Sequence, residues 1–219
     1  MPLLASPPSP PCPQLFLLIA ERHLGLGAGV PAGVAGSWRQ EGELPWALAS
    51  QLAPLVLPSG QLGAEAASRV ALGACGAIES ALKPVLQQDD SGSEPSTQGS
   101  PMHAALPTPA FVAAAATLAS QTACGLAQQG GGAGAATVDR VTDTLLTVCE
   151  DCTAAVAEIG VGDRASDALL SIALAIARQL LPLLTLAGER DGSALTDLLP
   201  RTQAVLVGTG QCCCLAGEG

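Results

Sequence analysis

Aromatic residues and lysine are scarce in this sequence. Aromatics make up 2% of the 219 residues, tyrosine is absent, and Lys83 is the only lysine among nine basic residues. A large cavity lined by aromatic side chains, which is the common design of a small-molecule site, is therefore not expected. Alanine, leucine and valine supply most of the apolar side chains, so we expect a core of small residues in which helices approach closely.

Positive charge is also scarce. The formal net charge is −10, and the nine basic residues stand singly along the chain. Proteins that bind nucleic acid or anionic lipid headgroups need clustered lysine and arginine facing the phosphates. The composition therefore predicts no nucleic-acid partner and no attachment to an anionic membrane surface.

No segment has the length and purity expected of a membrane span. The longest apolar stretch, residues 168–186, is interrupted by Arg178 and Pro182, and a charge at bilayer depth is costly. We interpret this stretch as a buried helix and predict no membrane span within the chain. Residues 15–20 form a second apolar run, but it is shorter than the core of a secretory signal and no basic residue precedes it.

The sequence offers no recognisable catalytic set. Its two histidines, His23 and His103, neighbour no plausible serine or cysteine nucleophile. Residues 27–32 match the spacing G-x-G-x-x-A, but Pro31 falls where a helix would have to begin and no βαβ unit follows. Several carboxylates fall on the polar faces of predicted helices, where a solvated surface is the ordinary explanation: Asp139, Asp143, Glu150, Glu158 and Asp167. We predict that the protein is not an enzyme and binds no cofactor.

Changes in composition divide the chain into five segments. Proline and glycine crowd the first segment, so it is predicted to be irregular. The third is polar, acidic and turn-rich, as expected of a linker that buries no apolar surface. The segments are an irregular region at 1–42, one or two helices at 43–87, an acidic linker at 88–107, a helical bundle at 108–200, and a short strand (203–207) or cysteine-rich tail at 201–219.

Helix signals are clearest after the linker. Thr108, followed by proline, is a typical helix start, and the glycine-rich residues 130–134 are predicted to form a flexible break after this helix. Thr137 and Asp163 are predicted to cap the next two helices. The short glycine-containing loop before Asp163 favours an antiparallel hairpin over 137–187. Apolar residues cover most of the circumference of its second helix, as expected of a central helix. The predicted fold is mostly α: a small alanine-rich helical bundle with this hairpin at its centre and with a disordered N-terminal region and linker.

An apolar stripe marks the first helix of the hairpin. Val141, Leu145 and Val148 recur in it at three- and four-residue spacing. We interpret these three residues as an interaction face for a protein partner or for the remainder of a larger chain. This hypothesis predicts that Leu145→Asp abolishes binding or self-association.

Cysteines are the other candidate site residues. Cys149 and Cys152 form a C-x-x-C, and Cys212, Cys213 and Cys214 are adjacent near the end of the chain. Thiolates bind metal ions and perform redox chemistry. The C-x-x-C falls in the middle of a predicted helix, however, and no second pair of ligands stands at a suitable spacing. Burial in a helical core is the ordinary interpretation of the pair, and metal binding or redox activity is the alternative.

Two runs within the predicted hairpin share a leucine and alanine periodicity: residues 139–149 (Asp-Arg-Val-Thr-Asp-Thr-Leu-Leu-Thr-Val-Cys) and residues 165–175 (Ala-Ser-Asp-Ala-Leu-Leu-Ser-Ile-Ala-Leu-Ala). This part of the chain resembles the helical region beside the autoproteolysis module of polycystin-like and egg-jelly-receptor-like ectodomains. The cleavage tripeptide of that module is not present, because His23 and Leu24 are followed by Gly25. The resemblance therefore implies a fragment or diverged piece of a larger ectodomain without self-cleavage activity.

Together these patterns predict a non-enzymatic helical module with a structural or protein-interaction role. A thiol-based metal-binding or redox protein is the first alternative. A spurious or truncated translation product without evolved function is the second, since the biased composition permits it. No pattern indicates the cellular compartment.

Overall fold

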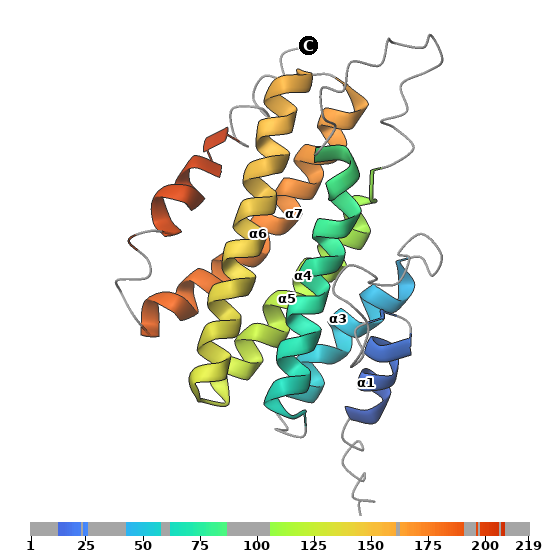
Figure 1. The fold of residues 1–219 in the computed structure, drawn as a ribbon, viewed down its shortest axis with the longest axis vertical. Helices are drawn as coiled ribbons and strands as arrows, with labels where there is room; N and C mark the ends of the chain where they lie inside the picture. Colours follow the sequence, from blue (N-terminus) through green and yellow to red (C-terminus); the bar gives the residue numbers. More distant parts are fainter. Residues whose placement is uncertain are drawn as a thin grey trace, which may run out of the picture.

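The structure, a computed structural model, describes residues 13–22, 24–25, 43–57, 62–86, 106–160, 163–190, 196, 198–205 and 207–208. Within these ranges the regular secondary structure is helical and no strand occurs. The helices are α1 (Pro13–Arg22), α3 (Leu44–Val56), α4 (Ala64–Leu86), α5 (Pro109–Gln128), α6 (Gly132–Ile159) and α7 (Arg164–Arg190). The predicted fold class, a mostly α helical bundle, is confirmed (Figure 1).

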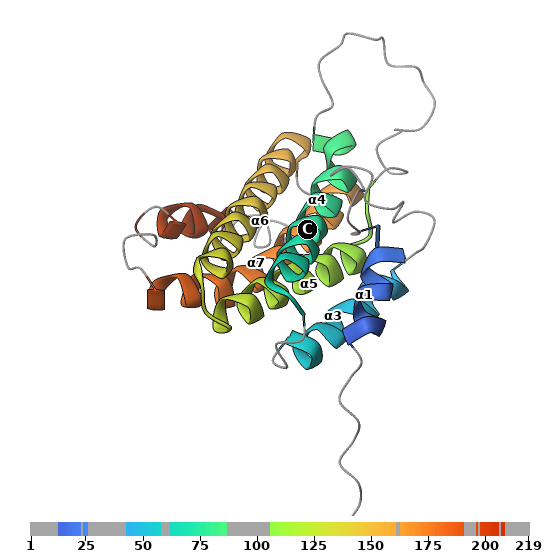
Figure 2. The same ribbon diagram turned by 60° about the horizontal axis from the view of Figure 1, so that its bottom comes forward.

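Helix α5 lies at the centre of the bundle. It packs against α3, α4, α6 and α7, whereas α7 packs mainly against α5 and α6. The expectation that the helix over 163–187 is central is therefore wrong, and two of its leucines, Leu174 and Leu181, are exposed. Helix α5 occupies the centre because six of its ten buried residues are alanine, serine or threonine, and these small side chains allow neighbouring helices to approach from several sides. The antiparallel hairpin of α6 and α7 forms the most extensive helix pair beside it (Figure 2).

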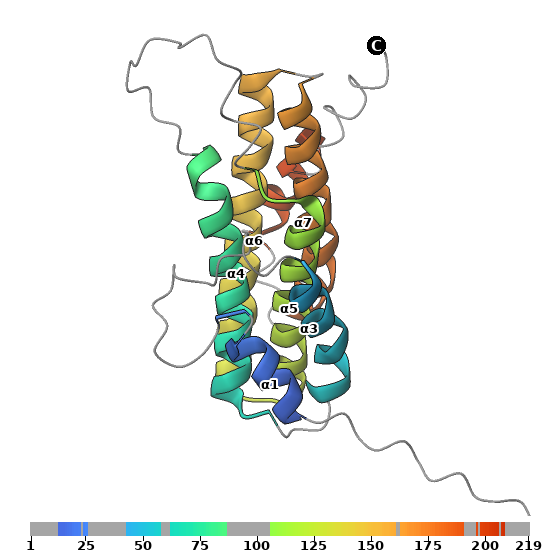
Figure 3. The ribbon, with the colours of Figure 1, turned by 90° about the vertical axis from the view of Figure 1, so that its right-hand side faces the viewer.

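The directions of the helices matter for the site described below. Helices α4 and α6 run in the same direction along the molecule, so that their C-terminal ends lie at the same end (Figures 1 and 3). Helix α7 runs back alongside α6 in the opposite direction (Figure 3). Helix α1 packs on α3 at the other end of the bundle.

The start of α5 agrees with the sequence prediction. The Thr108 side chain accepts a hydrogen bond of 3.2 Å from the Phe111 amide, and Pro109 occupies the first helical position. The Phe111 ring also meets Trp46 of α3 edge to face, with ring centroids 5.2 Å apart. The cap thus places the ring that joins α3 to α5.

The turn between α5 and α6 is tighter than expected. Instead of a break over 130–134, α6 begins at Gly132, and Gly130 and Gly131 make the turn with φ of 83° and 106°. These positive angles favour glycine. Gly134 is required for a different reason, because an added Cβ would lie 2.7 Å from the Cα of Ala127 in α5. Close contact between the two helix ends therefore replaces the predicted flexible break.

Thr137 does not cap α6, which corrects the prediction. It lies inside the helix, where its hydroxyl donates a hydrogen bond of 2.8 Å to the carbonyl of Ala133. Its Oγ1 also lies 3.0 Å from Oγ of Ser68, which links α6 to α4. By contrast, the predicted cap of α7 is confirmed, since Asp163 Oδ1 accepts a hydrogen bond of 2.7 Å from the Ala165 amide.

The N-terminal region is not irregular throughout. Residues Pro13–Arg22 form helix α1, whose Phe16 and Ala20 are buried, so the prediction for 1–42 is wrong over this part. The reason is local: Pro13 stands at the first helical position, where proline is tolerated, and the nine residues after it contain no proline. Residues 1–12 and 26–42 lie outside the described residues.

The predicted strand at 203–207 is also wrong. Residues 198–205 are helical, and Val205 is buried against the core. A short apolar, β-branched run favours a strand only weakly, and packing on a helical surface overrides that preference. The tail residues Cys212, Cys213 and Cys214 lie outside the described part of the chain.

A single apolar core unites the helices on both sides of the acidic segment. Buried residues of α1, α3 and α4 belong to the same cluster as those of α5, α6 and α7. The boundary placed at 88–107 therefore does not separate two cores, because α4 packs extensively on α5 and α6. Of that segment, residues 88–105 lie outside the described residues.

Two helices, α5 and α7, are long and apolar enough to cross a membrane by length and composition alone. Buried residues make up 56% of the apolar window of α5 and 39% of that of α7. The core helix of a soluble bundle passes the same test, so this is weak evidence for a span.

Candidate functional site

The three residues predicted to dock a partner are part of the bundle's own core. Val141 and Leu145 are 0% exposed and Val148 is 4% exposed. The prediction of an exposed interaction face is therefore wrong for Val141 and Leu145, and Val148, although buried, borders the groove between α4 and α6. Helix α6 packs on α4, α5 and α7, and these neighbours cover the stripe that looked unpartnered in the sequence.

The C-x-x-C pair lies in the same interior. Cys149 donates a hydrogen bond of 3.4 Å to the carbonyl of Ala173 in α7, and Cys149 and Cys152 are both 0% exposed. Burial raises the pKa of Cys149 to about 12, with Glu150 adding to the shift. The pKa of Cys152 is raised even further, first by burial and then by Cys149 and Asp151. Both sulfurs are thus held as thiols, whereas metal ligation and nucleophilic attack need thiolates.

In the part of the chain that the structure describes, no three His, Cys, Asp or Glu side chains come together as a group that could hold a metal ion. The other two described cysteines, Cys75 and Cys124, are free thiols like the C-x-x-C pair. Burial raises the pKa of Cys75 to about 12, with Glu79 adding to the shift. The described cysteines therefore behave as small apolar packing residues.

The described surface has a groove between α4 and α6, and this groove is larger than the hollow between α5 and α7. Its volume is about 710 Å³, and it follows the C-terminal halves of both helices. Leu82 and Val148 form a buried floor, and the partly buried Leu86 and Ala155 extend it. Gly76 opens one end, because a Cβ added there would meet no atom within 4 Å. The groove is therefore open to solvent over the partly buried Leu86 and Ala155, and Leu82 and Val148 are buried beneath it.

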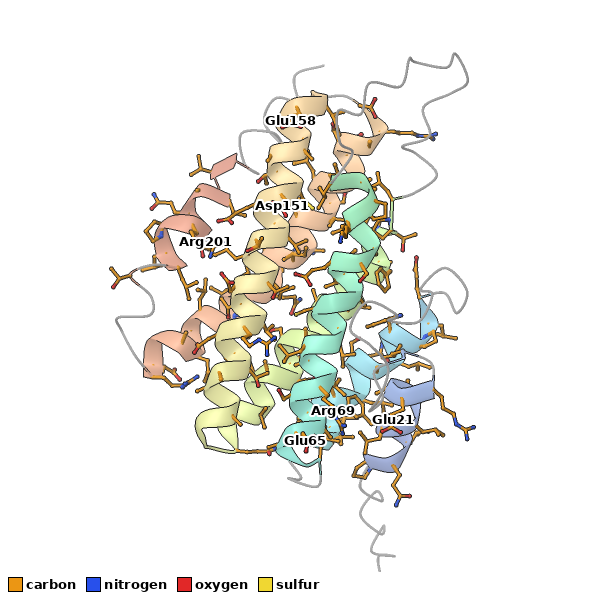
Figure 4. All side chains as sticks on the ribbon, viewed as in Figure 1. Glu21, Glu65, Arg69, Asp151, Glu158 and Arg201 are labelled. Atoms are coloured by element: carbon orange, nitrogen blue, oxygen red, sulfur yellow. The ribbon has the colours of Figure 1, made fainter. Side chains whose placement is uncertain are left out.

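Carboxylates dominate the rim of this groove. Glu79 of α4 and Asp151 and Glu158 of α6 line it and are exposed, against the single cation Lys83. Figure 4 shows Asp151 and Glu158 along the upper half of α6. The ion pairs among the described residues involve other carboxylates, so the three acids on the rim have no cationic partner there. The C-terminal ends of α4 and α6 add partial negative charge at the same end.

A second cluster of charges lies on the flank of α6 that faces away from α4 (Figure 4), and it shares Thr147 with the lining of the groove. Arg201 binds Glu150 in two places, with Nε to Oε1 at 2.9 Å and Nη2 to Oε2 at 2.8 Å. It also donates to Asp143 at 2.7 Å and to Thr147 at 3.1 Å. Asp143, Thr147 and Glu150 share one helical face by their spacing of four and three residues. Arg201 therefore fastens the helical segment 198–205 to α6, beside the buried Val205.

Sequence reasoning missed both the groove and the role of Arg201. Asp143, Glu150 and Glu158 were placed correctly on the polar face of a helix, but their spacing does not indicate which of them meets a cation. The groove combines residues about seventy positions apart, so no local pattern marks it. A signal was available only for Arg201, a single cation that follows a predicted acidic helix face.

A smaller hollow of about 440 Å³ lies between the C-terminal parts of α5 and α7. Cys124, Leu181 and Pro182 contribute to its lining, and Leu181 is 70% exposed. Glu189 is its only charged lining residue. This hollow therefore lacks the several charged rim residues that line the groove between α4 and α6.

Comparisons of the chain with protein-family models, with curated proteins and with solved structures gave no match. The resemblance to the helical region of polycystin-like ectodomains accordingly stays a prediction from the sequence.

Proposed function

We propose that the protein is a non-enzymatic helical interaction module whose binding site is the groove between α4 and α6. The observation that supports this most strongly is the combination of an apolar floor with a charged, solvent-exposed rim. Protein interfaces have the same composition, since a desolvated apolar centre supplies the affinity and a polar rim surrounds it.

The dimensions of the groove suit a helix as the bound element. The lining residues of α4 extend from Gly76 to Leu86 and those of α6 from Thr147 to Glu158, which corresponds to about 15 Å along each helix axis. A partner helix of about three turns covers that length. Its apolar side chains at helical spacing would rest on the partly buried Leu86 and Ala155, beside the buried Leu82 and Val148, as in other helix-in-groove complexes.

A library of displayed helical peptides tests this proposal without assuming the partner's identity. Clones are selected on the wild-type protein and then measured on Gly76→Trp and Gly76→Ala. The indole at position 76 extends into open space and obstructs this end of the groove, so binding is expected to be lost. The methyl group of alanine leaves most of the groove free, so binding is expected to persist.

Both variants remove the same glycine from a helix, which favours the fold by up to about 1 kcal/mol. Their circular dichroism and thermal midpoints serve as the folding control. The proposal is contradicted if the selected peptides bind Gly76→Trp as tightly as the wild type, or if no peptide binds the wild type.

A further inference from the structure

We infer that the occupant of the α4–α6 groove is a basic amphipathic helix of a different protein. This inference rests on the proposed function and adds the chemistry of the partner. The rim carries three carboxylates, from Glu79, Asp151 and Glu158, against the one ammonium of Lys83. A helix with lysine or arginine beside its apolar stripe would match both the floor and the rim.

The rim charge is available to a partner. All three carboxylate residues are exposed, and Lys83 is the only cation among the described residues that line the groove. Arg201 of segment 198–205 lies on the flank of α6 that faces away from α4 (Figure 4), where its guanidinium is occupied by Glu150 and Asp143. The two helix C-termini at this end strengthen the negative potential.

This chain does not supply such a helix itself. Its closest pair of basic residues, Arg190 and Arg201, stands eleven positions apart, so a three-turn segment carries one cation at most. The segment that follows α4, residues 87–105, contains Asp89, Asp90 and Glu94 and no lysine or arginine. Neither an internal segment nor a second copy of the chain therefore complements the groove, and a net charge of −10 opposes self-association further.

Electrostatic complementarity predicts how binding depends on charge and salt. Ion pairs on an exposed rim contribute modestly one by one, but several act together in choosing the partner. Apolar contact with the floor contributes the same binding free energy for a basic helix as for an acidic one. The preference between the two is therefore carried by the rim and weakens as salt screens it.

Two synthetic helical peptides of about 14 residues test the inference on the full-length protein. They share one leucine face and differ only in having lysine or glutamate at the flanking positions. We expect the lysine peptide to bind at least about tenfold more tightly at low salt. At about 1 M NaCl, where the Debye length is about 3 Å, the ratio should fall toward one.

The double variant Asp151→Asn with Glu158→Gln should weaken the lysine peptide by about tenfold and leave the glutamate peptide unchanged or tighter. Glu65→Gln is the matched control, since Glu65 is 88% exposed at the opposite end of α4. This control should bind the lysine peptide as the wild type does.

These experiments distinguish an error in the partner's chemistry from an error in the location of the binding site. If both peptides bind equally and Gly76→Trp abolishes both, the groove binds helices but the basic partner is overturned. If neither peptide binds, or if Gly76→Trp has no effect, both proposals are overturned. A concentration-dependent dimer that Gly76→Trp dissociates would identify a second copy as the occupant and would also overturn the inference.

Discussion

Gly134→Ala gives a sharp test of how closely α5 and α6 meet. A Cβ at this position would lie 2.7 Å from the Cα of Ala127 and 2.9 Å from the carbonyl oxygen of Leu126. Carbon atoms in favourable contact stand about 3.5–4.0 Å apart. Both obstructing atoms are backbone, so no side-chain rotation relieves the clash and the end of α5 must move.

The size of the effect follows from two opposing contributions. Overpacking a well-packed site costs about 1–3 kcal/mol, and replacing glycine recovers about 0.4–1 kcal/mol by restricting the unfolded chain. We expect Gly134→Ala to lower the free energy of unfolding by about 1–2 kcal/mol. Gly132→Ala is the matched control two residues earlier in the same helical turn, where an added Cβ meets nothing within 4 Å. It should be neutral or stabilising.

Urea unfolding followed by circular dichroism measures both variants. With a slope of about 2 kcal/mol per molar urea, the midpoint of Gly134→Ala should fall by about 0.5–1 M, while that of Gly132→Ala should not fall. Equal midpoints for the two variants would refute the close approach of α5 and α6 and the turn that produces it.

Three further predictions concern the core, the attachment of segment 198–205 and the thiols. Leu145→Ala should lower the free energy of unfolding by about 2–5 kcal/mol because the side chain is fully buried. Leu181→Ala, at a site 70% exposed, should change the free energy of unfolding by less than about 0.5 kcal/mol. Similar urea midpoints for the two variants would contradict the burial of Leu145. Arg201→Met should lower the free energy of unfolding by about 1 kcal/mol at low salt and by less at about 1 M NaCl, as measured by urea unfolding at both salt concentrations. A loss of stability that does not depend on salt would argue against the ion pair of Arg201 with Glu150. The pKa of Cys149 is raised from 9.0 to about 12 in the folded protein, so its contribution to stability is complete below pH 9 and is lost as the pH rises toward 12. Thermal melts across this range should therefore show a smaller loss in Cys149→Ala than in the wild type, and parallel losses would contradict a buried thiol.

Local signals in the sequence predicted several helix ends correctly. Thr108 and Asp163 cap α5 and α7 because a side-chain oxygen and an amide two or three residues later meet whatever the rest of the fold does. The failures are of another kind. Thr137 looked like a cap, but the contact of Gly134 with α5 allows α6 to begin at Gly132, six residues before the predicted start.

Tertiary packing explains the remaining failures. The stripe of Val141 and Leu145 was visible in the sequence, but the pattern does not reveal whether a partner or the same chain covers it. The structure buries both residues inside the bundle. The strand predicted at 203–207 is likewise replaced by a helix that packs on the core through Val205.

Local sequence patterns could not predict the candidate groove. Its walls come from 76–86 and 147–158, and only the packing of α4 on α6 brings these segments together. From the sequence, Glu158 was interpreted as an ordinary solvated residue, and no binding role was predicted for Asp151. Their significance depends on an apolar floor between them that the sequence does not display.

Photo-crosslinking tests the central claim most directly. The lysine-rich helical peptide, carrying a photoreactive leucine analogue on its apolar face, is irradiated with the wild-type protein and the crosslinked residues are mapped by mass spectrometry. The account predicts crosslinks within 76–86 of α4 and 147–158 of α6, the two walls of the groove. Crosslinks concentrated instead at the exposed leucines of α3 or around Leu181 of α7 would contradict it.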